Sequence, residues 1–218
     1  MKKNKLKPAL KEIKGGFYDN ALKILDEVIA EDRTNYEAYL YRGKVKRELN
    51  DYRGALDDYN SAVEINPQRA EVYNNRSKLF YFMCFYEKAL QDIIKANEIH
   101  PECPLILFNR AVIESKLYMY RDALVSFGLS IKINPVFIPA YLKRGLLNEK
   151  TGYYQGALRD YAHVIKLNKN CPYAYYYRGK LLINYIKDER RGKKDLSIAY
   201  RLGIKKKEIR NILESSAR

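Results

Sequence analysis

The chain has 218 residues, 47% of them hydrophobic, and a formal net charge of +15. This apolar content is sufficient for a buried core. No run of about 18 apolar residues is present, and no apolar stretch of about 7–15 residues follows the basic amino terminus, so we expect neither a membrane span nor a secretory signal and predict a cytoplasmic protein. Cys84, Cys103 and Cys171 lack metal-ligand or redox spacing, which predicts reduced thiols.

A period of 34 residues runs through the chain. Four residue types recur at this step: tyrosine at 18, 52, 86, 120 and 154; alanine at 21, 55, 89, 123 and 157; leucine at 22, 56, 90, 124 and 158; and arginine at 42, 76, 110, 144 and 178. A fixed period of about this length is the signature of a helical solenoid, in which each repeat buries its apolar faces against its neighbours.

The repeats can be placed in chain order. Residues 2–35 form a degenerate first repeat, residues 36–69, 70–103, 104–137 and 138–171 form four full repeats, and residues 172–204 form a divergent sixth. Each full repeat is expected to be two antiparallel helices; in the first, residues 36–49 and 53–65 flank a turn at 50–52. Asn66-Pro67, His100-Pro101 and Asn134-Pro135 end second helices, because proline disfavours helical geometry in the residue before it.

The carboxyl-terminal part departs from the fixed spacing. Ala199 falls one residue late, and we place the extra residue in the turn at 187–192. In the last segment, 205–218, residues 205–215 predict an amphipathic helix with Ile209, Ile212 and Leu213 on one face. We expect this helix to cover the exposed end of the stack; the alternative is that it folds back into a binding groove.

Small and large residues alternate where the two helices of a repeat should cross. Ala55 and its equivalents lie on the second helix, and the facing place on the first helix also holds small residues: Gly43, Ser77, Ala111, Gly145 and Gly179. Small side chains let helix axes approach to about 8–10 Å. Four residues after the alanine the large residues Tyr59, Ile93, Phe127 and Tyr161 lie on the same face.

These features resemble the tetratricopeptide repeat family over nearly the whole chain. The family's first aromatic matches Tyr39, Tyr73, Tyr141 and Tyr175, and its small residue, alanine, second-helix aromatic and proline match the series above. The resemblance implies an all-α, right-handed superhelical solenoid of helix-turn-helix repeats with a capping helix at the carboxyl terminus. The chain differs where the family usually has leucine, three residues after the first aromatic, because it has arginine there.

The arginine column has a structural and a functional interpretation. A buried guanidinium group is costly unless it is paired. Asp58, Asp92 and Asp160 share one place on the second helix, and Asp195 matches it if one residue is inserted. We therefore predict Arg–Asp ion pairs within or between repeats. The alternative is a ladder of cations that faces a ligand.

In the resembling family the first helices line a concave groove that binds peptides. Carried over to this sequence, the groove would contain Leu40, Lys44, Asn74, Asn75, Lys78, Phe108, Asn109, Val112, Leu142, Lys143, Leu146, Tyr176 and Lys180. Phe108, Val112, Leu142 and Leu146 would form an apolar patch of the kind that usually binds a partner, flanked by lysines 44, 78, 143 and 180. The alternative is that some of these side chains pack against neighbouring first helices. The family's carboxylate-clamp pattern fails around both Asn75 and Asn109, which argues against a chaperone tail as the ligand.

The sequence contains no catalytic constellation. His100 and His163, the only histidines, have no cysteine at nucleophile or ligand spacing, so we expect no enzyme, cofactor or metal. We predict a non-catalytic adaptor that binds an extended or helical protein segment through an apolar anchor with acidic flanks. Two alternatives remain. One is binding of nucleic acid or another polyanion through the basic ends, residues 1–14 and 187–218, and the other is homo-oligomerisation through an end of the solenoid.

Overall fold

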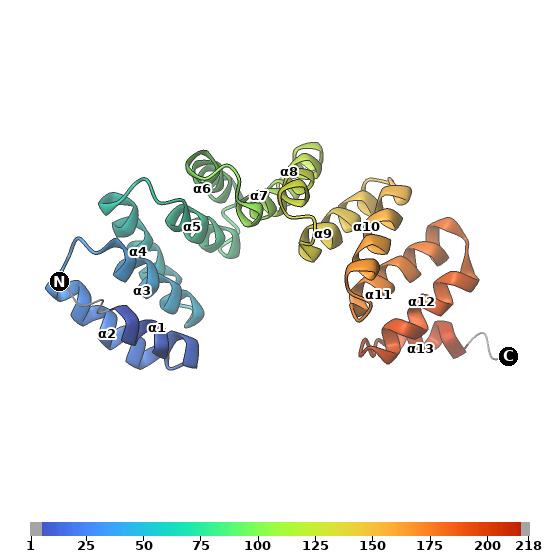
Figure 1. The fold of residues 1–218 in the computed structure, drawn as a ribbon, viewed down its shortest axis with the longest axis horizontal. Helices are drawn as coiled ribbons and strands as arrows, with labels where there is room; N and C mark the ends of the chain where they lie inside the picture. The colour runs from blue at the N-terminus through green and yellow to red at the C-terminus, as the bar shows by residue number, and fades with distance from the viewer. Residues whose placement is uncertain (1–5, 215–218) are drawn as a thin grey trace. The chain divides into compact units, whose positions relative to one another are not determined.

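The computed structural model describes residues 6–214, and within this range all regular secondary structure is helical (Figure 1). The predicted segments at 2–5 and 215–218 lie outside the described residues, as do the side chains of Glu208, Leu213 and Glu214. The chain divides into two compact units, Met1–Ile113 (unit 1) and Glu114–Arg218 (unit 2).

Unit 1 is built from successive helix pairs. Its helices are α1 (Leu6–Gly15), α2 (Tyr18–Glu31), α3 (Tyr36–Glu48), α4 (Tyr52–Ile65), α5 (Ala70–Phe82) and α6 (Tyr86–Ile99), followed by α7 (Pro104–Lys116), which continues past residue 113. The helices α1 and α2, α3 and α4, and α5 and α6 pack as pairs, and each pair packs on the next through α2 against α3 and α4 against α5.

Unit 2 repeats this arrangement. It contains α8 (Tyr120–Ile133), α9 (Ile138–Lys150), α10 (Tyr154–Leu167), α11 (Pro172–Leu181), a π-helical turn η1 (Leu182–Ile186), α12 (Glu189–Arg201) and α13 (Lys207–Glu214). The helices α9 and α10, and α11 and α12, form pairs. The all-α solenoid of helix pairs predicted from the sequence is confirmed.

The turns between paired helices keep the same conformation. One residue in each turn has a positive φ: Gly16, Asn50, Cys84, Tyr118, Gly152 and Lys187. After α3, the Asn50 amide donates to the Arg47 carbonyl at 3.0 Å and the Asp51 amide donates to the Lys46 carbonyl at 2.8 Å. These two bonds define a Schellman motif, which satisfies carbonyl groups left unpaired at the helix end.

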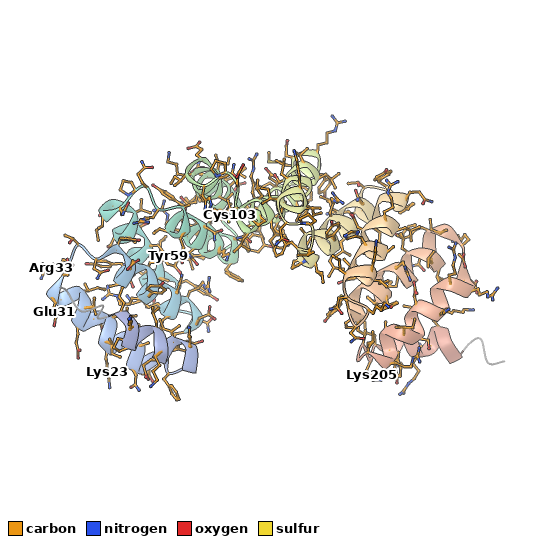
Figure 2. All side chains as sticks on the ribbon, in the orientation of Figure 1. Lys23, Glu31, Arg33, Tyr59, Cys103 and Lys205 are labelled. Atoms are coloured by element: carbon orange, nitrogen blue, oxygen red, sulfur yellow. The ribbon has the colours of Figure 1, made fainter. Side chains whose placement is uncertain are left out.

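The predicted alternation of small and large residues is confirmed within pairs. Ala55 and Ala157 are fully buried, and so are the large residues Tyr59 (labelled in Figure 2) and Tyr161. A Cβ atom added to Gly145 would lie 2.6 Å from the Tyr161 ring. Glycine fits there without displacing the tyrosine ring, whereas a side chain would force the ring to move.

The extra residue of the last repeat lies earlier than predicted. The positive-φ residues are spaced by 34 up to Gly152, and the next one, Lys187, comes 35 residues later. The added residue therefore precedes Lys187 and is accommodated by η1, and the predicted position at 187–192 is wrong. A π-helical turn absorbs one residue without ending the helix, and the closing bond from the Asp188 amide to the Leu182 carbonyl (2.9 Å) spans the longer turn.

The last helix covers the end of the final pair. Helix α13 packs on α12, and Ile209 is fully buried with Ile204, Leu196 and Ala199. Ile212 lies partly buried against the same cluster. The predicted capping role is confirmed for the described part of this segment.

Candidate functional site

The arginine column forms ion pairs with the second helices. Four of the five arginines are paired with the aspartate predicted for them: Arg42 with Asp58, Arg76 with Asp92, Arg144 with Asp160, and Arg178 with Asp195, at distances of 2.6–2.7 Å. These aspartates are buried. The structural interpretation of the column is confirmed for these four pairs, since each guanidinium group compensates a carboxylate that has lost its hydration.

The same arginines also stack on the aromatic residue of their own helix. The guanidinium carbons lie 5.4–5.9 Å from the ring centroids of Tyr39, Tyr73, Tyr141 and Tyr175. This distance is within the range of a cation–π interaction. Arginine can therefore replace the usual leucine of the family, because its stem packs on the tyrosine while its head binds the aspartate.

A cluster of cations lies on the first helices of unit 1. Lys44 of α3 pairs with Glu71 of α5 at 2.6 Å and lies 4.7 Å from the centroid of the Tyr41 ring. Lys78 of α5 is only partly exposed and has no ion pair within residues 6–214. Burial lowers the pKa of Lys78, and the neighbouring charges of Arg47 and Lys44 lower it further. The site therefore carries more positive charge than its own acidic residues neutralise.

Arg47 of α3 lies near the predicted groove residues, although the sequence does not predict it there. It lies one turn after Lys44 and is one of the charges that act on Lys78. Its spacing of three residues from Lys44 could have indicated that the two share a helix face. Its guanidinium carbon also lies 5.9 Å from the centroid of the Phe82 ring.

The predicted groove asparagines are held by internal hydrogen bonds. Asn74 and Asn75 are buried, at 6% and 7% exposure. The side-chain amide of Asn109 donates to the Asn74 side-chain oxygen at 2.8 Å, which joins α7 to α5. The Asn75 amide donates to the Glu71 carbonyl of its own helix at 2.8 Å.

Two other predicted groove residues have little surface left for a ligand. Leu40 is 1% exposed and belongs to a core cluster with Tyr59 and Val72. Tyr176 is 4% exposed in the cluster that includes Ile209, and its hydroxyl accepts a hydrogen bond from Lys206 at 3.3 Å. The alternative, packing against a neighbouring first helix, describes Leu40, which contacts the cluster of Val72 on α5, whereas Tyr176 packs with residues of α12 and α13.

The remaining predicted residues are distributed over the two units. Phe108 and Val112 are partly buried and lie on α7 in unit 1, whereas Leu142, Lys143 and Leu146 lie on α9 in unit 2. Leu142 packs partly buried against two core clusters, and Lys143 is exposed. Lys180, on α11, lies 5.6 Å from the centroid of the Tyr176 ring.

The described residues contain neither a membrane-spanning helix nor a metal-binding cluster. Between residues 6 and 214 no helix is long and apolar enough to cross a membrane. In the same part of the chain, no group of three His, Cys, Asp or Glu side chains is arranged to hold a metal ion.

Comparison with known proteins identifies the repeats. A family profile described as TPR repeat matches residues 43–82, and one described as tetratricopeptide repeat matches residues 138–171. The tetratricopeptide repeat protein 36 homolog of Nematostella vectensis is 36% identical over 63 residues, which are 26% of this chain and 35% of that protein. The chain thus matches about a third of the length of this curated relative.

Solved structures share the fold at low sequence identity. PilW, a type IV pilus biogenesis factor, has a TM-score of 0.85 at 17% identity, with 96% of each chain covered. PilF of Pseudomonas aeruginosa has a TM-score of 0.83 at 18% identity, with 97% of this chain and 96% of that one covered. YrrB, described as a TPR protein with an unusual peptide-binding site, has a TM-score of 0.69 at 18% identity and covers 89% of this chain and 98% of its own. Together with the period and the helix pairs, these matches show that the chain belongs to the tetratricopeptide repeat family.

Proposed function

We propose that this protein is a non-catalytic adaptor that binds an acidic segment of a partner protein on the first helices of unit 1. The family fold is a protein–protein interaction scaffold, and its members are typically non-catalytic. YrrB, a structural neighbour, is described as having a peptide-binding site. The proposal assigns the segment's acidic residues to the cluster around Lys44 and Lys78.

One observation supports this assignment most. Lys78 is a partly buried ammonium group whose pKa is lowered by burial and by two neighbouring cations, and it has no ion pair in the described chain. A carboxylate placed beside it would relieve this unfavourable environment. The free energy gained by pairing Lys78 is available to a partner, because Glu71, the internal carboxylate that acts on Lys78, forms its ion pair with Lys44 instead.

The apolar anchor of the partner is assigned to the same unit. Phe108 and Val112 are partly buried on α7, and α7 is tied to the helix that bears Lys78 through the Asn109–Asn74 hydrogen bond. A segment with an apolar residue near two or three acidic residues has the chemistry to use both features. Leu142 and Leu146 lie on α9 in unit 2 and are not assigned to this site.

Selection from a random peptide library tests the proposal. We expect the wild-type protein to enrich peptides with an apolar residue close to acidic ones, and Lys78→Glu to weaken binding of the selected peptides at least about tenfold. Lys95→Glu is the matched control, since Lys95 lies on the second helix α6 and pairs there with Glu98. Enrichment without acidic residues, or equal loss of binding in both variants, contradicts the proposal.

Polyanion binding through the basic ends is the second candidate. Part of the carboxyl-terminal charge is neutralised internally, because Arg191 pairs with Asp188 and Lys193 pairs with Glu189. A fluorescent single-stranded oligonucleotide distinguishes the two functions. Affinity that falls steeply with salt and is unchanged by Lys78→Glu would favour the ends over the first-helix site.

A further inference from the structure

A second polar site lies in unit 2, between the first helix α9 and the second helices α8 and α10. A cavity of about 510 Å³ opens among α8, α9 and α10. Its lining includes Leu124, Tyr141, Arg144, Tyr153, Arg159 and His163. We call it the Arg144 pocket. None of the residues assigned above to partner binding lines it.

The pocket exists because one repeated contact is missing. In unit 1 the Nη1 atom of Arg42 donates to Asp26 at 2.6 Å, and that of Arg76 donates to Asn60 at 2.9 Å. Asp26 and Asn60 occupy the same place in the second helix of the preceding repeat, 16 residues before the arginine. The corresponding residue before Arg144 is Gly128, which has no side chain to accept this bond.

Arg144 is therefore left with an unused donor. Its Nε and Nη2 atoms bind Asp160 at 3.0 and 2.6 Å. Its Nη1 atom has no hydrogen-bond partner among residues 6–214, and it lies 3.9 Å from the position that a Cβ atom on Gly128 would take. The guanidinium group is thus oriented by Asp160 and offers its remaining N–H groups to the pocket.

One further cation and one reporter group line the pocket. Arg159 lies 5.5 Å from the centroid of the Tyr153 ring, donates to the Tyr153 hydroxyl, and has no ion pair in the described part of the chain. The Nε2 atom of His163 is shielded from solvent and has no hydrogen-bond partner there. The His163 ring is stacked on Tyr141 with the centroids 4.4 Å apart, which fixes its plane.

The charge of the pocket selects the kind of anion. Arg144 is balanced by Asp160, so Arg159 leaves one unneutralised positive charge. A monoanion satisfies this charge, whereas a phosphate dianion would leave one negative charge unbalanced in the pocket. Guanidinium groups bind planar carboxylates through paired N–H donors.

We propose that the Arg144 pocket binds a carboxylate group through Arg144 and Arg159, beside the ring of His163. The carboxylate comes either from a glutamate or aspartate side chain of a protein or from a free small carboxylic acid. The polar residue 16 positions before the arginine is also missing one repeat later, where Ala162 takes the place of Asp26. A cavity of about 410 Å³ lies there beside Arg178. This recurrence indicates that losing the polar residue opens the space beside the arginine.

Histidine resonances provide the test, because the chain has only two histidines. The protein is labelled with 15N-histidine and titrated with sodium acetate, and separately with N-acetylglutamate α-methylamide, at constant ionic strength kept with sodium chloride. We expect the ring resonances of His163 to shift to saturation, while those of His100, which is exposed in a turn, stay unchanged. Tighter saturation by the glutamate compound identifies a protein side chain as the source, and equal or tighter saturation by acetate identifies a free acid.

Variants make the test specific to the pocket. Gly128→Asp restores the acceptor that Asp26 provides in unit 1, and it should abolish the saturable shift by occupying the Arg144 donors. Arg159→Gln should weaken binding about tenfold, the effect of losing one charged hydrogen bond. Lys166→Gln, which changes an exposed lysine of the same helix outside the pocket, should leave it unchanged. The proposal is overturned if chloride alone reproduces the shift, if both histidines shift together, or if the shift persists unaltered in Gly128→Asp and Arg159→Gln.

Discussion

At the scale of single residues, the arginine column shows how this chain departs from its family without losing the fold. Each of four arginines satisfies a buried aspartate and covers a tyrosine ring. The pairing could be predicted, because a buried charge demands a partner and the aspartates share the same period. The unused N–H donor of Arg144 could not be predicted from the pairing with Asp160 alone. It depends on which residue of the preceding repeat faces the Nη1 atom.

Removing one partner of an Arg–Asp ion pair should destabilise the fold more than replacing both partners by apolar residues. Arg76→Leu leaves Asp92, which is 6% exposed, buried without its cation, and we expect a loss of about 3 kcal/mol in the free energy of unfolding. Arg76→Leu with Asp92→Leu should cost clearly less, because no unpaired charge remains. Urea unfolding followed by circular dichroism measures both. A double variant as unstable as the single one would contradict this account.

The turn conformation predicts opposite effects at equivalent positions. Cys84 adopts a φ of 62°, and Gly152 a φ of 80°. Left-handed geometry costs a residue with a Cβ atom about 1 kcal/mol, so Cys84→Gly should raise the free energy of unfolding by roughly that amount and Gly152→Ala should lower it similarly. Thermal denaturation of the two variants checks the prediction. Changes of the same sign would show that the turns are not equivalent.

The charge environment of Lys78 predicts a pH dependence. Its pKa in the folded state is lowered, first by burial and then by Arg47 and Lys44, so the unfolded state binds its proton more tightly. Between the lowered folded pKa and the ordinary lysine value of 10.5, folding is therefore stabilised as the pH rises. We expect Lys78→Met to be more stable than wild type at neutral pH and this advantage to shrink as the pH approaches 10.5.

Denaturant unfolding of both proteins from pH 7 to 10 measures this difference. The comparison removes the contribution of the other lysines, which titrate equally in the two proteins. An advantage of Lys78→Met that stays constant or grows with pH would contradict a lowered pKa for Lys78.

At the scale of elements, the period predicts each helix but not how an irregularity is absorbed. The late position of Ala199 indicates one extra residue, yet any place between Gly179 and Ala199 is compatible with it. The structure places it in η1, because continuing the helix by a π turn keeps Arg178 opposite Asp195. Physical constraints on the helix end, rather than the repeat pattern, decide the location.

Removal of the extra residue tests this view of η1. Asn184 is exposed within the π turn, and its deletion restores the regular spacing, so we expect a free energy of unfolding within about 1 kcal/mol of wild type. Deletion of Lys150, the exposed residue at the corresponding place of α9, shortens a regular turn. That control should cost at least about 2 kcal/mol, because it displaces a packed helix. Equal costs of the two deletions would refute the assignment.

At the scale of the whole molecule, the sequence predicts the fold, and it also predicts Lys44 and Lys78, two residues of the proposed binding site. The period predicts where each helix begins and which of its residues are equivalent between repeats. It does not predict which residues of a first helix face the groove and which pack against the neighbouring helix. Leu40 is buried for this reason, and Tyr176 is covered by the capping segment, which lies outside the period. Lys44 and Lys78 are partly exposed, and for this reason they are the residues assigned to the proposed binding site.

Site-specific photo-crosslinking tests the central claim, that an acidic protein segment binds beside Lys78. A benzophenone amino acid is introduced in place of Lys78 or, as control, Lys95 on α6, and the protein is irradiated with a peptide that the wild-type protein has selected. Because the change removes one cation at the site, the peptide is used at saturating concentration. The account predicts a crosslinked product from position 78 and none from position 95, with yield falling when the acidic residues of the peptide are replaced by amides. Equal crosslinking from both positions, or a yield at position 78 that does not depend on the acidic residues, would contradict it.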